Sequence, residues 1–203
     1  MTTRRGTPDN PLVHPITGER IVFLKRSRDT GGALLQIQHF MAPGGFVAAP
    51  HVHPNQEERF AVRDEPLVFR IRGVERTYQP GETAVVPAGA PHVWWNPGQQ
   101  EAHVLMEFLP ALNTETFFEN WFGLAADGRF NGKGLPRSVL QLMVIARDYR
   151  REIGFPPPLS WIVTPLSFAL APVARLRGYR GRYERYSGRA EAVPTPLDVG
   201  VRS

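Results

Sequence analysis

The chain of 203 residues contains no cysteine. This absence excludes a disulfide framework, a thiolate metal site, a cysteine-ligated iron–sulfur cluster and a cysteine nucleophile. Uninterrupted apolar runs of about 18 or more residues are also absent, which argues against a conventional transmembrane helix. The nearest approach, residues 159–176, is interrupted by Pro165, Pro172 and Arg175. Residues 1–20 are polar and do not form a signal peptide, so we expect a cytoplasmic protein.

Proline and glycine, in contrast, are abundant, at 20 and 19 residues. A helical bundle does not tolerate so many helix breakers, whereas a turn-rich β fold does. Hydrophobic residues make up 42% of the chain and aromatic residues 10%, which is too apolar for a disordered chain. The composition therefore predicts a globular protein that is mainly β.

The net charge of +5 comes from one segment, because residues 172–189 hold six arginines against Glu184 alone. A basic segment can bind acidic lipid or nucleic acid, or it can be a solvated end whose guanidinium groups pair with carboxylates and backbone. We favour the solvated end. No helix-turn-helix pattern is visible, so we expect no nucleic-acid partner.

Short apolar or alternating runs bounded by turn residues predict strands before Pro110. They lie at residues 20–26, 33–41, 59–63, 67–72, 77–78, 83–87, 92–96 and 103–109. The alternation of 33–41 fails at His39 and Phe40, so that strand either bulges or is partly covered on both faces. Many short strands at close spacing predict a sandwich or barrel.

The pattern becomes helical after Pro110, with helices expected at 113–124, 137–152 and 159–176. The chain therefore divides into four parts. They are an N-terminal segment with the first strand (1–29), a β-barrel (30–110), a helical extension (111–180) that packs on the barrel or on a dimer partner, and a basic, loosely ordered tail (181–203).

Three of the six histidines lie in two segments framed by glycine and proline. His51 and His53 are two residues apart, so in a strand both imidazoles point to one face, about 7 Å apart. A proline-containing stretch after them permits a bend that brings Glu57 or Glu58 alongside, and His92 lies in another extended segment. Three imidazoles and one carboxylate suit Fe(II), Mn(II), Ni(II), Cu(II) or Zn(II), not calcium.

The first of these segments resembles the first motif of the cupin superfamily, which is a glycine, five residues, His-x-His, three or four residues, a glutamate, six residues and a glycine. The residues that fit are Gly45, His51, His53 and either Glu57 or Glu58. We prefer Glu58 because Phe60 and Val62 then share its inward face. The turn glycine, which would fall at Asp64 or Glu65, is absent.

The second segment resembles the second cupin motif, which is a glycine, five residues, Pro-x-Gly, two residues, a histidine, three residues and an asparagine. Every position matches: Gly81, Pro87, Gly89, His92 and Asn96. The resemblance covers about residues 30–110. The whole chain is also similar to bacterial cupins that carry a helical C-terminal extension, a group without a settled reaction.

The resemblance implies a cupin-type jelly-roll β-barrel with a C-terminal α-helical extension, and one divalent transition metal ion (Fe, Mn, Ni, Cu or Zn). The implied metal ligands are His51, His53, Glu58 and His92. Phe46, Phe60 and Trp94 are candidates to line the pocket, although barrel interiors are packed with such side chains in any case. The fold does not imply a substrate.

A metalloenzyme acting on a small organic molecule is the function that this resemblance favours. Oxygenase-type chemistry, natural for Fe(II), ranks first by family analogy. Isomerase or hydrolase chemistry through Lewis-acid polarisation ranks next. The alternative is a non-catalytic cupin that binds or senses a small ligand.

The apolar segment 137–176 has two interpretations. It covers the open face of the barrel or forms a dimer interface, and we expect a homodimer. The less favoured interpretation is peripheral membrane contact through 156–190, with Trp161 and Phe168 in the lipid and the following arginines on headgroups.

Overall fold

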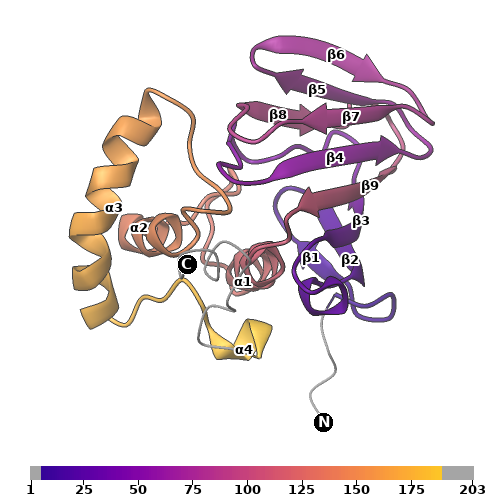
Figure 1. Ribbon diagram of the computed structural model, residues 1–203. Coiled ribbons are helices and arrows are strands. Elements are labelled where there is room, and N and C mark those ends of the chain that lie inside the picture. Colours follow the sequence, from indigo (N-terminus) through magenta and orange to yellow (C-terminus); the bar gives the residue numbers. More distant parts are fainter. Residues whose placement is uncertain (1–5, 189–203) are drawn as a thin grey trace.

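The computed structural model describes residues 6–188, in which two antiparallel sheets stand beside a group of helices (Figure 1). The strands are β1 (Leu12–His14), β2 (Glu19–Lys25), β3 (Leu35–Met41), β4 (Glu57–Val62), β5 (Leu67–Ile71), β6 (Val74–Tyr78), β7 (Thr83–Val86), β8 (His92–Trp95) and β9 (Ala102–Leu109). The helices are α1 (Thr114–Ala126), α2 (Val139–Asp148), α3 (Leu159–Leu176) and the short α4 (Glu184–Ser187). A 3-10 turn covers Ser27–Thr30.

The two sheets form a jelly-roll sandwich. The larger sheet has the order β1-β2-β3-β9-β4-β7, and the smaller has the order β6-β5-β8. Within residues 6–188 no ladder joins the two sheets at their edges, so the expected barrel is an open sandwich. The segment 45–52 lies along β8 through bridges at Phe46 and His51, and it extends the smaller sheet toward the helices.

The core lies between the sheets, and strand alternation determines which side chains enter it. In β3 every second residue, His39 included, is buried, and the residues between them are half-buried. The strand is therefore covered on both faces and has no bulge at His39. The register shift lies in β2 instead, between Phe23 and Lys25.

A tight turn joins β5 to β6. Arg72 and Gly73 both have positive φ, of 52° and 84°, as a two-residue hairpin turn that matches the strand twist requires. The turn after β4, where the first motif lacks its glycine, has no positive φ at residues 63–66. The Asp64 side chain accepts hydrogen bonds there from the backbone of Glu65 and His103, so a glycine is not needed.

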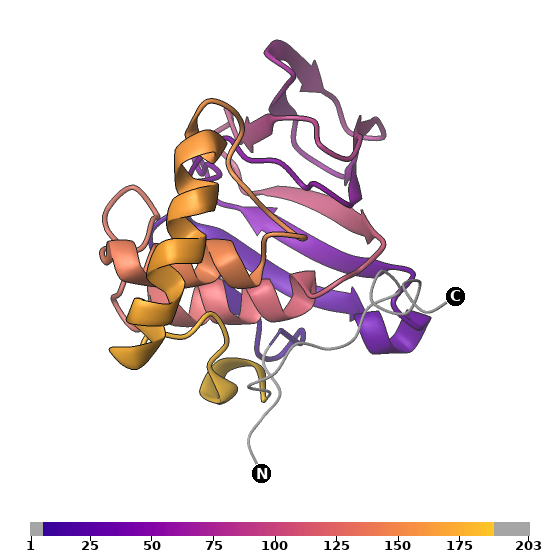
Figure 2. The same ribbon diagram turned by 60° about the vertical axis from the view of Figure 1, so that its left-hand side comes forward.

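The helices lie on one side of the sandwich (Figure 2). α1 packs against β1, where the His14 ring contacts Phe122. Ser138 caps α2 by accepting a hydrogen bond from the Gln141 amide at 3.4 Å. α3 packs on α2, with Ala171 and Ala174 against Val144, and it is the outermost helix, at the left of Figure 1.

Arg26 joins the N-terminal segment to α1. Its guanidinium donates to Glu115 at 2.6 Å and to Glu119 at 3.1 Å, and all three side chains are buried.

In the predicted tail, residues 181–188 are described, and the Tyr186 ring is buried against α1 at Gly123. Residues 189–203 of that tail lie outside the described residues.

Candidate metal centre

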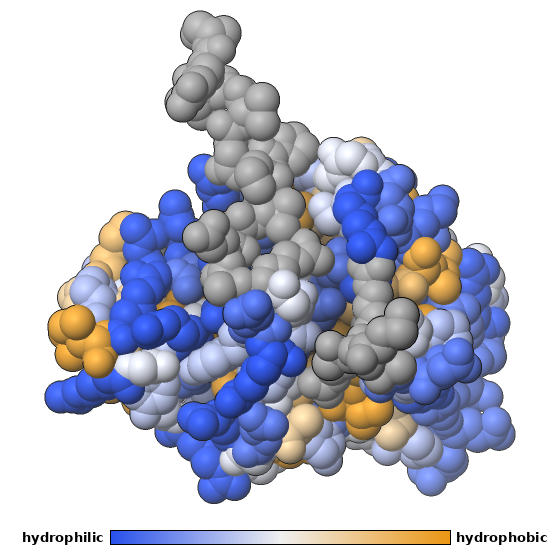
Figure 3. Space-filling view, turned by 90° about the horizontal axis from the view of Figure 1, so that it is seen from below, coloured by the Kyte–Doolittle hydropathy of each residue, from blue (hydrophilic) through white to orange (hydrophobic). Residues whose placement is uncertain are grey.

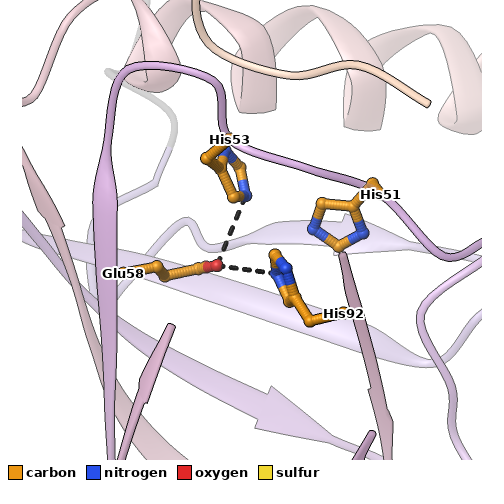
Figure 4. Close-up of side chains that lie close together, drawn as sticks. All are labelled: His51, His53, Glu58 and His92. Carbon is orange, nitrogen blue, oxygen red and sulfur yellow. Dashed lines mark ion pairs between the residues drawn. The ribbon is translucent and has the colours of Figure 1, made fainter. Parts of the chain in front are cut away.

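Three imidazoles and one carboxylate converge at the end of the sandwich that faces the helices (Figure 4). His51 and His53 precede β4, Glu58 lies in β4 and His92 begins β8. Their ligand atoms all lie within 4.8 Å of one another. The bridge between His51 and His92 sets these two residues side by side, with backbone N···O distances of 3.0 and 2.9 Å in the two directions.

Each of the three histidines has Nδ1 close to a backbone carbonyl oxygen. The carbonyls belong to Ala49 for His51 (3.1 Å), Glu152 for His53 (2.6 Å) and Ala90 for His92 (3.0 Å). A carbonyl can only accept, so each Nδ1 carries the hydrogen and each neutral imidazole keeps its lone pair on Nε2. This is how histidines that bind metal are commonly oriented.

The atoms that face the centre of the cluster lack hydrogen bonds. Glu58 Oε2 lies 3.3 Å from His53 Nε2 and 3.0 Å from His92 Nε2. None of these three buried atoms is in hydrogen-bond geometry with a partner in the described chain. Buried polar atoms are costly when unsatisfied, and a divalent transition ion would satisfy all of them. The residues therefore fit a metal.

The electrostatics of His51 and Glu58 favour the protonation states that bind metal. Burial lowers the pKa of His51 well below its ordinary value, and the neighbouring His92 and His53 lower it further. Burial would raise the pKa of Glu58, but His53 and His92 outweigh burial and hold that pKa well below the usual range. For His53, burial lowers the pKa and the Glu58 carboxylate raises it more, so the net pKa is raised.

The helical extension holds the loop that carries the histidines. Val52 and Gly154 exchange two backbone hydrogen bonds of 2.9 Å, and the Asn55 side chain donates to the Arg151 carbonyl at 3.0 Å. The buried Gln56 amide donates to the Pro110 carbonyl at 2.8 Å. The segment after α2 thus positions the first two imidazoles from outside the sandwich.

A cavity of about 600 Å³ opens from the cluster toward the helices. Near the cluster its polar wall includes His51, His53 and Glu58. Away from the cluster its wall is mainly apolar and comes from α1, α2, α3 and the loop between α2 and α3. This part of the wall includes Phe117, Phe118, Trp121, Phe122, Leu142, Ile145, Ile153, Phe155, Val163 and Phe168. The extension therefore forms the roof of a mainly apolar chamber.

The predicted site residues are placed as follows. Glu58, not Glu57, joins the cluster, because the buried face of β4 carries Glu58, Phe60 and Val62 while Glu57 pairs with Arg59 outside. Trp94 lines the cavity. Phe60 is fully buried in the core behind the cluster, with its ring 6.4 Å from that of His92. Phe46 is 38% exposed and does not belong to the cavity wall.

Sequence reasoning missed a buried acid in the cavity wall, Glu19. Its carboxylate lies 3.1 Å from His39 Nε2 and accepts a hydrogen bond from the Thr17 hydroxyl. Burial raises the pKa of Glu19, but His39 and Thr17 outweigh burial, so the net pKa is lowered. One indication was present in the sequence, since a histidine on the apolar face of 33–41 needs a buried polar partner.

Part of the chain is similar to known proteins. The model of the family described as "Cupin domain" matches residues 39–108. An oxidoreductase from Arthrobotrys oligospora is 33% identical over 90 residues, which are 40% of this chain and 36% of that protein. Oxalate oxidase 1 from Hordeum vulgare is 27% identical over 114 residues, which are 52% of this chain and 55% of that protein.

Among solved structures, a predicted oxalate decarboxylase from Thermotoga maritima has a TM-score of 0.44 at 18% identity. The match covers 45% of this chain and 80% of that one. The chain thus spans about a third and about half of the length of the two curated relatives it matches. These curated matches leave much of the chain uncovered.

Proposed function

Because this chain belongs to the cupin superfamily through its cupin domain at residues 39–108, we propose that it is a metal-dependent oxidoreductase. Its substrate would be a small, mostly apolar organic molecule, and dioxygen would be the oxidant. The observation that carries the proposal is the opening of the His/Glu cluster into the apolar chamber under the helices. Two curated relatives that are oxidoreductases by name support the reaction class.

His51, His53, Glu58 and His92 would hold the ion, and we propose Fe(II), because dioxygen activation is natural for iron on nitrogen and oxygen ligands. When bound, such an ion supplies the electrons and the open positions that dioxygen chemistry needs. The chain supplies the surroundings. The aromatic walls and the helical roof exclude water, and the three Nδ1–H···O=C hydrogen bonds fix the imidazoles.

The size and lining of the chamber indicate the substrate class. A volume of about 600 Å³ lies within the range of about 300–1,000 Å³ for pockets that hold drug-sized ligands. A small dianion such as oxalate, the substrate named for the Hordeum relative, would leave most of this space empty and would face mainly apolar side chains. We therefore propose a larger, apolar substrate that presents one oxygen donor to the cluster.

Glu19 would accept a proton from this substrate. Its carboxylate is the buried acid of the chamber wall outside the predicted ligand set. Because its pKa is lowered, the group is ionised at neutral pH and can act as a base. Thr17 and His39 hold it in place and would stabilise its charge.

Turnover of apolar substrates tests the proposed function. The Fe(II)-loaded protein, supplied with a panel of phenols, enols and hydroxylated terpenoids in air, should consume oxygen in step with at least one of them. Oxalate should give no oxygen uptake. If metal-loaded protein binds members of the panel without converting any of them, the non-catalytic binding cupin replaces the enzyme. Turnover of oxalate alone would contradict the substrate class.

Replacing Glu19 tests the proton acceptor. The Glu19→Gln variant keeps the size and shape of the side chain but cannot take a proton, so turnover should fall by about 10²–10⁴-fold while metal content stays unchanged. Steady-state rates and elemental analysis measure the two effects. Thr17→Val is the matched control. It removes one hydrogen bond to the carboxylate and should cost much less. Equal loss in both variants would contradict the assignment.

A further inference from the structure

The distribution of side chains around α3 is the reverse of that in an ordinary surface helix. Its buried positions carry the small residues Ser167, Ala171 and Ala174. Its solvent face carries the large apolar side chains Leu159, Trp161, Ile162, Leu166, Phe168, Val173 and Leu176. Among residues 6–188, α3 is also the one helix long and apolar enough to cross a membrane by length and composition.

The exposure of this face is extensive. Trp161 is 72% exposed, Ile162 64% and Leu176 89%. Soluble proteins rarely leave a contiguous apolar patch of this kind uncovered, and such patches mark protein or membrane interaction sites. Seen from below, hydrophobic residues gather at the left margin of the molecule, beside a strongly hydrophilic strip (Figure 3).

Arginines border this apolar face. The Arg147 guanidinium stacks 3.7 Å above the Phe168 ring, and Arg175, in the last turn of α3, pairs with Asp148. Beside them lies a hollow of about 350 Å³. Its charged lining consists of Arg147, Arg150, Arg151, Arg175 and Arg182 against Asp148 and Glu152. The hollow therefore carries an excess of positive charge next to an apolar ridge.

We propose that α3 is a membrane-docking surface that lies in the plane of an anionic phospholipid bilayer. Its apolar face would enter the boundary between headgroups and acyl chains, and the bordering arginines would contact lipid phosphates. This combination of apolar side chains with basic residues at the flank is what binding at such a boundary requires.

A second copy of this chain complements the surface less well. A symmetric dimer across α3 would use the same patch on both subunits. Each copy carries the same excess of arginine beside its patch, so a second copy offers no opposite charge there. A bilayer with acidic lipids offers the opposite charge and an apolar interior at the same time.

A spanning arrangement is disfavoured by the contacts of the inner face. Ala171 and Ala174 pack on α2, and Val163 and Ser167 line the chamber. A helix that crossed the bilayer would lose its contacts with α2 and its place in the chamber wall. With α3 lying flat, the roof of the chamber faces the lipid, which is where an apolar substrate accumulates. This last step depends on the proposed function, whereas the docking itself does not.

Vesicle co-sedimentation tests the docking surface. The full chain should sediment with vesicles of equimolar phosphatidylcholine and phosphatidylglycerol, but much less with phosphatidylcholine alone, and added salt should release it. The partition coefficient of the Ile162→Glu/Leu176→Glu variant into the mixed vesicles should be at least about tenfold lower than that of the native chain, because two apolar anchors are lost. Val74→Glu/Val85→Glu, at exposed positions on β6 and β7, is the matched control and should bind as the native chain does.

The two α3 positions are exposed, so the double variant should fold, and circular dichroism checks this. Trp161 emission adds a second readout. It should shift to shorter wavelength with mixed vesicles, and the shift should be absent in Trp161→Phe.

Equal sedimentation of the native chain and the α3 variant, or no binding of the native chain, would overturn the proposal. A native dimer that the α3 variant converts to monomer, without vesicle binding, would assign the surface to a second copy. Metal content and turnover are measured separately, so their failure would leave the docking result standing.

Discussion

The His51→Ala/His53→Ala variant is expected to lose nearly all of the divalent metal that the native protein carries, together with its turnover. Two of the four clustered ligand atoms disappear, and the remaining carboxylate and imidazole are too few to hold the ion firmly. Native protein, purified without an affinity-metal column, should contain about one ion per chain. Elemental analysis of the two proteins measures the difference.

His103→Ala is the matched control for this experiment. His103 is half-buried and stacks on Phe40 on the outer face of β9, with ring centroids 4.6 Å apart, so its loss should leave the metal content unchanged. If neither native protein nor variant binds metal after soaking with Fe(II), Mn(II) and Zn(II), the metal centre is wrong. Iron in the native protein would support oxygen chemistry, whereas zinc alone would favour isomerase or hydrolase substrates.

The Arg26→Met variant is expected to be less stable by about 3–5 kcal/mol, the usual cost of removing one partner from a buried ion pair. Arg26 lies between Glu115 and Glu119 in a buried cluster, and its removal leaves two buried carboxylates without their guanidinium. Chemical denaturation measures the change. Arg20→Met is the matched control, because the exposed Arg20–Glu101 pair should contribute only about 0–1 kcal/mol.

A triple variant separates charge from packing. Adding Glu115→Gln and Glu119→Gln to Arg26→Met removes the two buried negative charges that faced the guanidinium, so much of the lost stability should return. If the triple variant is no more stable than Arg26→Met, the guanidinium acts mainly through packing. A loss in Arg26→Met no larger than that in Arg20→Met would contradict the role of the buried cluster.

Local patterns predicted much of the fold, and the resemblance to the two cupin motifs implied the four clustered residues as one set. Two-residue spacing put His51 and His53 on one side, and the alternation of β4 chose Glu58 over Glu57. The helix expected at 159–176 has those bounds in the structure. These features depend on the strand and helix periods, which are visible in a single sequence.

Features that depend on contacts between distant segments could not be predicted. Glu19 meets His39 only because β2 and β3 pair. The sequence around Glu19 did not indicate which residue would be the polar partner of His39. Strand patterns alone could not show that the sheets stay open at their edges. Phe46 was expected in the pocket from its place in the motif segment, but the bridge to Trp95 leaves its side chain partly outside.

The hydrogen bond from His53 to the Glu152 carbonyl joins residues that are 99 positions apart. During synthesis the first motif therefore leaves the ribosome long before the segment that orients its second imidazole. The segment that matches the cupin family ends at residue 108, so the nascent sandwich can form while this ligand loop is still unsupported. The orientation of the loop, and with it the proposed capture of metal, becomes complete only after α2 and Gly154 have been translated.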